Sequence, residues 1–108
     1  MMMNEGLIMQ NVRLEGLFEL DERGYVLYSN QKTTGVASKG RHFFTELADF
    51  ENASDLQRRF DLFRVAAIPA QSFQFTCNYS DGPTQVKVLI ARLLKDSSKT
   101  FLLDLRPA

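Results

Sequence analysis

The chain has 108 residues, of which 44% are hydrophobic, and its 13 basic residues balance its 13 acidic residues. This length fits one domain, and nine phenylalanines suit a packed core rather than disorder. A neutral chain lacks the positive field of most nucleic-acid and anionic-membrane binders, so we expect neither partner. One cysteine excludes an internal disulfide. A single cysteine also fits a reducing cytoplasm, so we expect a cytoplasmic protein, and the sequence has neither a signal peptide nor a run of roughly 20 apolar residues.

Residues 4–12 form a short apolar segment that could be a helix. Its apolar side chains are Leu7, Ile8, Met9 and Val12. A helix this short is marginal in water, and such a patch is not easily left exposed. We therefore separate a helical extension, residues 1–13, from a domain over residues 14–108. We expect the four apolar side chains to form a homodimer contact or to cover the sheet of their own domain.

Residues 14–28 predict a β-hairpin. Gly16, Phe18 and Leu20 fall on one face of its first strand, and Tyr25–Tyr28 is the second strand. The turn between them is Asp-Glu-Arg-Gly, whose glycine can adopt a positive φ. The polar residues 30–41 then predict a short irregular helix or a surface loop.

A long helix is predicted over residues 52–68. Asn52 is a better first residue than Thr45, because Asp55 follows it within the first turn. Pro69 is expected to end the helix. The apolar positions that recur at helical spacing, and should face the sheet, are Leu56, Phe60, Phe63 and Ala67.

Three strands follow the helix. In residues 73–79 the apolar side chains alternate strictly with polar ones, so this strand is half-buried. Residues 86–94 and 101–105 predict the next two strands, with turns at 81–83 and 95–99. Connections this short make the strands antiparallel. The expected fold class is α+β, with a five-stranded antiparallel sheet packed on one side by helices.

The order of these elements, with the motif LFELDERGYVLYSN, resembles the PAS domain over about residues 14–106. The stretches HFFTELA, FQFTCNY and TQVKVLI are similar to the photoactive yellow protein branch of that family. In this branch a Gly-x-x-Phe-Phe segment leads to a Pro-Cys pair, and the cysteine carries a p-coumaroyl thioester. Counting from Phe43 and Phe44, the cysteine position is Phe50 and the proline position is Asp49. Phenylalanine has no nucleophile, so the resemblance implies the fold without this chemistry.

The branch also holds its chromophore with polar side chains that are not found at the matching positions. Aligned on Asn30, a tyrosine is replaced by Ser29 and a glutamate by Thr33. The family's threonine and arginine fall near Ala37 and Lys39. The group of residues that stabilises the phenolate charge is therefore missing.

The resemblance points to a candidate ligand pocket between the helices and the sheet. Its members are Phe43, Phe44, Phe50, Phe63, Ser29, Thr33 and His42. The phenylalanines either line this space or fill it, and filling is favoured because a void is costly.

Two further residues have alternative roles. His42 is a candidate haem ligand, since some PAS domains bind haem through a histidine, but a capping or partly exposed histidine is the simpler interpretation. No second histidine or nearby cysteine completes a zinc site, and we expect no other cofactor. Cys77 lies on the apolar face of its strand, which favours packing over redox sensing.

No catalytic constellation is found, so we expect a protein that is not an enzyme. The prediction is a sensory or signal-transduction domain that acts through a small ligand, through protein–protein contact, or through both, with an unidentified signalling protein as partner. The alternative is a structural dimerisation module with a filled core and no ligand.

A small enzyme on a cone-like α+β fold would need a polar cavity with an acid or base inside. A chain of this length leaves no room for an output domain, so it should signal through a partner or belong to a longer regulator.

Overall fold

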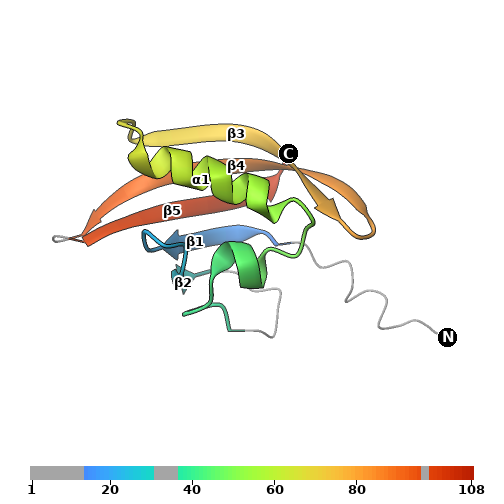
Figure 1. The fold of residues 1–108 in the computed structure, drawn as a ribbon, viewed down its shortest axis with the longest axis horizontal. Coiled ribbons are helices and arrows are strands. Elements are labelled where there is room, and N and C mark those ends of the chain that lie inside the picture. Colours follow the sequence, from blue (N-terminus) through green and yellow to red (C-terminus); the bar gives the residue numbers. More distant parts are fainter. Residues whose placement is uncertain (1–13, 31–36, 96–97) are drawn as a thin grey trace.

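A computed structural model describes residues 14–30, 37–95 and 98–108. The elements in chain order are β1 (Gly16–Leu20), β2 (Val26–Ser29), the helical turn η2 (Phe43–Leu47), α1 (Ala53–Val65), β3 (Ala70–Tyr79), β4 (Gly82–Lys95) and β5 (Ser98–Pro107). The strands form one antiparallel sheet in the order β2-β1-β5-β4-β3, with α1 and η2 over one face (Figure 1). This confirms the predicted α+β fold.

The first hairpin forms as predicted, but β1 begins only at Gly16 and β2 lies one residue later than predicted, at Val26–Ser29. Its turn is held by Asp21, whose Oδ1 accepts hydrogen bonds from the backbone N–H groups of Arg23 and Tyr25, both at 2.9 Å. Gly24 closes the turn with a φ of +92°. The register shifts between Glu19 and Leu20, which lie opposite Tyr28 and Val26 of β2. Of the predicted loop at 30–41, the structure describes residue 30 and residues 37–41.

Helix α1 buries the predicted face but is shorter than predicted. Leu56, Phe60 and Phe63 are at most 1% exposed. The chain leaves the helix at Ala66, where ψ is 155°. The prediction that Ala67 continues the buried face is therefore wrong, because that residue lies beyond the helix and is exposed.

Asn52 precedes α1 as predicted, but its side chain does not cap the helix. Its Nδ2 donates to the carbonyl of Thr76 at 2.7 Å, and its Oδ1 accepts from the N–H of Asn78 at 2.9 Å. The predicted capping role is thus wrong, because the amide instead ties the start of α1 to the edge of β3.

The last three strands pair over nearly their whole length. Tyr79 is opposite Gly82, so the β3–β4 turn is Ser80-Asp81, one residue earlier than predicted. Pro83 lies within β4, opposite Asn78, whose N–H and C=O groups point away from β4 toward Asn52 and Glu51. The missing N–H of proline therefore removes no ladder bond. In β5, Phe101, Leu103 and Leu105 face the core and are at most 2% exposed.

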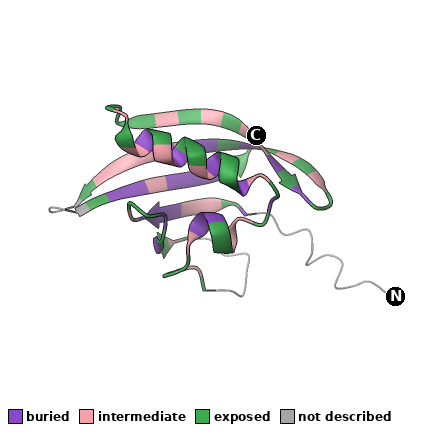
Figure 2. Ribbon diagram, in the orientation of Figure 1, coloured by how far each residue is buried: buried purple, intermediate pink, exposed green. Residues whose placement is uncertain are grey.

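The core lies between α1, η2 and the inner face of the sheet. Buried residues lie along the side of α1 that faces the strands and along the central strands beneath it (Figure 2). No helix in the described part of the chain has the length and apolar character needed to cross a membrane.

Candidate functional site

A continuous row of aromatic rings occupies the space between the helices and the sheet. Its members, in order of contact, are Phe18, Phe43, Phe44, Phe60, Phe101 and Phe63. Neighbouring ring centres are 4.9 to 6.3 Å apart, and four of the five contacts are edge-to-face. Such distances are typical of favourable aromatic pairs in closely packed cores. The row joins β1 to η2, α1 and β5.

The structure divides the candidate pocket residues between two groups of rings. Phe43, Phe44 and Phe63 belong to the row. Phe50 lies before α1, and its ring centre is 5.5 Å from that of Tyr79 and 6.1 Å from that of Phe75.

The other three candidate pocket residues, Ser29, Thr33 and His42, are polar. Ser29 is opposite Phe18 across the first hairpin, next to the start of the row. Thr33 lies outside the described residues, as do Leu7, Ile8, Met9 and Val12, so their predicted roles stay predictions.

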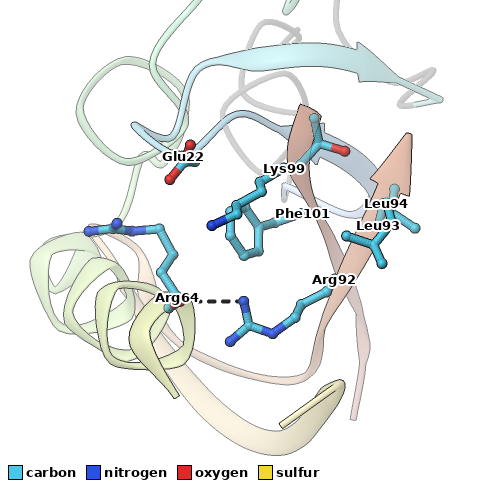
Figure 3. Close-up of a pocket in the computed structure, with 8 residues that line it drawn as sticks. Glu22, Arg64, Arg92, Leu93, Leu94, Lys99 and Phe101 are labelled. Atoms are coloured by element: carbon cyan, nitrogen blue, oxygen red, sulfur yellow. Dashed lines mark hydrogen bonds between the residues drawn. The ribbon is translucent and has the colours of Figure 1, made fainter. Parts of the chain in front are cut away.

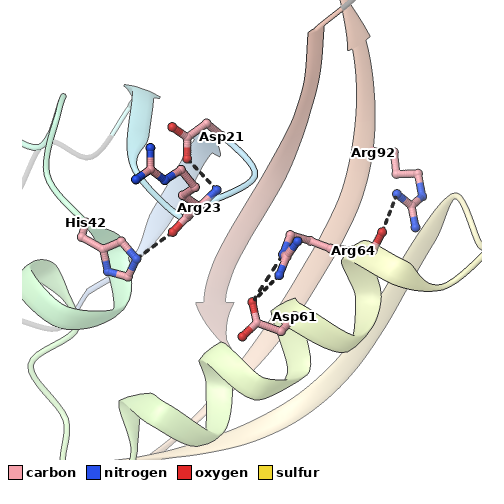
Figure 4. A network of polar contacts seen from close by, with 6 residues as sticks. All are labelled: Asp21, Arg23, His42, Asp61, Arg64 and Arg92. Carbon is pink, nitrogen blue, oxygen red and sulfur yellow. Dashed lines mark hydrogen bonds and ion pairs between the residues drawn. The ribbon is translucent and has the colours of Figure 1, made fainter.

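His42 uses both ring nitrogens in the protein itself. Its Nδ1 accepts from the backbone N–H of Thr45 at 3.2 Å, which caps the helical turn η2. Its Nε2 lies 2.7 Å from the carbonyl of Arg23, to which it donates when Nδ1 is the acceptor (Figure 4). The capping interpretation therefore describes the observed geometry, and a haem iron would have to displace one of these bonds.

Gly24 explains how closely the hairpin turn approaches His42. A Cβ at this glycine would lie 3.0 Å from Nε2 of His42 and 3.3 Å from the ring of Phe44. The turn can therefore seat the imidazole only with glycine at this position.

Arg92 is the main polar feature that the sequence did not reveal. It is on the inner face of β4, and its guanidinium donates to the carbonyls of Phe63 in the last turn of α1 and of Ala66 and Ile68 just beyond the helix. It also donates to the carbonyl of Arg64 at 3.3 Å, and Arg64 in turn pairs with Asp61 (Figure 4). Nothing in the local sequence of β4 predicts these contacts between Arg92 and the end of α1, which we call the helix clamp.

A pocket of about 180 Å³ opens beside this clamp (Figure 3). It is lined by Glu22, Arg64, Arg92, Leu93, Leu94, Lys99, Thr100 and Phe101. Three of these side chains are cationic and one is acidic. Phe101 belongs to the aromatic row, so one wall of the pocket is formed by a core residue.

A second hollow, of about 330 Å³, lies next to Phe50. It is lined by Ala48, Asp49, Phe50, Glu51, Asn78 and Ser80. Within the described residues, no group of three or more His, Cys, Asp or Glu side chains is placed to hold a metal ion.

No protein-family model matches the chain. Photoactive yellow protein of Halochromatium salexigens is 29% identical over 89 residues, which cover 77% of this chain and 71% of that protein. The photoactive yellow protein domain of the sensor histidine kinase Ppr from Rhodospirillum centenum superposes with a TM-score of 0.64 at 18% identity, over 95% of this chain and 93% of that one. The chain has the PAS fold. The predicted resemblance is thereby confirmed.

Other PAS domains superpose at lower identity. The domain of BvgS from Bordetella pertussis has a TM-score of 0.64 at 11% identity, over 87% of this chain and 76% of that one. The domain of the RpfR quorum-sensing receptor from Cronobacter turicensis, in complex with BDSF, has a TM-score of 0.59 at 16% identity, over 86% of this chain and 92% of that one. These likenesses concern the fold of the chain alone.

Proposed function

We propose that this PAS domain is a non-catalytic sensory domain that signals through protein–protein contact and has no p-coumaroyl photochemistry. The observation that carries this proposal is the environment of Phe50. This residue stands at the position that matches the chromophore cysteine, and it is 4% exposed between Tyr79 and Phe75. A benzyl side chain in that place forms no thioester and instead contributes to the core.

The aromatic row supports signalling by protein contact rather than by a ligand within the core. Rings from η2, α1 and the sheet occupy the space that a core ligand would need. The partners on this proposal are a second copy of the chain and a separate signalling protein. A purely structural dimerisation module with the same filled core is the alternative.

The pocket beside Arg92 favours a second candidate, the binding of a small anion. Arg64, Arg92 and Lys99 place three positive charges around it, against the single carboxylate of Glu22. Two effects oppose an anion here, because Asp61 pairs with Arg64 and the end of α1 contributes partial negative charge. Chemical-shift changes on titration with acetate or inorganic phosphate test this candidate. Lys99→Ala should abolish them, whereas Lys87→Ala, on the outer face of β4, should not.

Native mass spectrometry of the purified chain tests the main proposal. The expected spectrum is a homodimer with no additional mass. A small molecule retained through purification would instead support ligand sensing. A monomer alone at tens of micromolar would contradict contact with a second copy.

A further inference from the structure

β3 is one outer strand of the sheet, and no described element lies beside it along most of its length (Figure 1). Its ten residues, AQSFQFTCNY, include no charged residue and no proline. Natural proteins usually protect such an edge with charges, proline, bulges or a covering segment. β3 has no charged residue, no proline and no bulge, so it is suited to pairing with another strand.

The opposite edge of the sheet is covered by the chain itself. Val26 in β2 receives a hydrogen bond at its carbonyl from the N–H of Gly40, at 2.8 Å. Its own N–H donates to the carbonyl of Arg41, at 2.9 Å. The two edges therefore differ.

The hydrogen bonds at the end of β3 show which backbone groups point outward. The carbonyl of Thr76 and both backbone groups of Asn78 bond to Asn52 and Glu51, away from β4. Because outward groups alternate along a strand, those of Ala70, Ser72 and Gln74 point the same way. Within the described part of the chain, nothing hydrogen-bonds to them.

We propose that a second copy of this chain pairs with this open stretch, β3 against β3, antiparallel, with Ser72 opposite Ser72 of the copy. In this register Ala70 lies opposite Gln74 of the copy, and Gln74 lies opposite Ala70 of the copy. Every outward N–H and C=O group of these three residues then finds a partner. The stretch is symmetric about Ser72, so an identical strand satisfies it completely under two-fold symmetry.

Two further features favour a copy in this one register. The strand carries no charge, so self-pairing brings no like charges together across the strands. The bonds of Asn52 close the edge beyond Gln74, which prevents the pairing from sliding along β3.

The helix beside this edge offers apolar contact to an added strand. The guanidinium carbon of Arg59 lies 3.8 Å from the centre of the Phe73 ring, so this flank of α1 faces the edge of β3. Leu62, three residues further along the helix, is 61% exposed. An added strand would cover part of it. The inference rests on the proposed role in protein contact and adds the surface and the register.

Sedimentation of the full chain tests the proposal through Ser72. The side chain is exposed on the outer face of the sheet, so substitution should leave the fold intact. Ser72→Lys places two ammonium groups opposite each other at the two-fold axis and should weaken the dimer at least tenfold. Ser72→Thr keeps a small polar side chain and should leave the strength of the dimer unchanged. An equally strong dimer in Ser72→Lys would overturn the register, while leaving the proposed signalling role standing.

Two more variants separate this surface from the N-terminal segment. Deletion of residues 1–12 should leave the dimer intact, whereas its loss would support the N-terminal contact predicted from the sequence and overturn this one. Ser72→Cys should form a disulfide-linked dimer on mild oxidation, because paired Cα atoms at such a position are about 5.5 Å apart. Ser54 is exposed at the start of α1, so Ser54→Cys is the control and should form no disulfide-linked dimer.

Discussion

The guanidinium of Arg92 lies 4.9 Å from the centre of the Phe63 ring and donates from Nη2 to the Phe63 carbonyl at 2.7 Å. One side chain of β4 therefore contacts both the ring and the backbone of the last turn of α1. Carbonyls at the end of a helix have no partner within it, and a cation nearby also offsets the helix dipole. Through this contact, Arg92 holds the end of α1 against the sheet.

Removal of this clamp should destabilise the domain. Arg92→Ala leaves several carbonyls at the end of α1 without a donor, and we expect a loss of about 2–3 kcal/mol in the free energy of unfolding. Arg92→Lys should recover only part of it, because an ammonium cannot reproduce the planar array of donors. Urea unfolding measures both, with exposed Arg58→Ala as a control expected to change little. Equal stability of Arg92→Ala and the wild type would exclude the clamp.

The aromatic row makes Phe60 a critical packing residue. It is 1% exposed and contacts both Phe44 and Phe101. Phe60→Ala should cost about 3–5 kcal/mol because it removes a buried ring and leaves a cavity. Leu62→Ala, in the same helix but 61% exposed, should cost much less. A loss under about 1 kcal/mol for Phe60→Ala would show that the buried face is wrongly assigned.

Two glycines separate the effect of backbone strain from that of crowding. Gly24 and Gly40 have similar positive φ values, +92° and +88°. Alanine at Gly24 would press on His42 and Phe44, whereas a Cβ at Gly40 meets nothing within 4 Å. Both substitutions should cost on the order of 1–3 kcal/mol through strain, and Gly24→Ala should cost more. Thermal unfolding of the two variants measures the difference, and equal losses would show that crowding at His42 is unimportant.

Periodicity predicted the fold well, because α1 and the strands have regular apolar patterns. Phe60 and Phe63 fall at helical spacing, and Phe101, Leu103 and Leu105 alternate, so their burial followed from the sequence. The end of α1 at Val65 did not follow from periodicity. The carbonyl of the next residue, Ala66, accepts from Arg92, which lies 26 residues further along the chain.

The polar contacts of the site were less predictable than its rings. Asn52 has the residue type of a helix cap, yet its amide bonds to Thr76 and Asn78 on β3. A cap is a local interaction, whereas this contact exists only once the strand lies beside the helix. The open edge of β3 likewise depends on strand order, which alternation alone does not give.

Exposure of the protein to activated p-coumaric acid tests the central claim most directly. With Phe50 buried at the cysteine position and Cys77 at 0% exposure, the folded chain should gain no mass and no absorbance band near the visible. The denatured chain, in which the thiol of Cys77 is exposed, is the positive control for the reagent. A folded protein that gains a coumaroyl group and the corresponding absorbance would contradict the account.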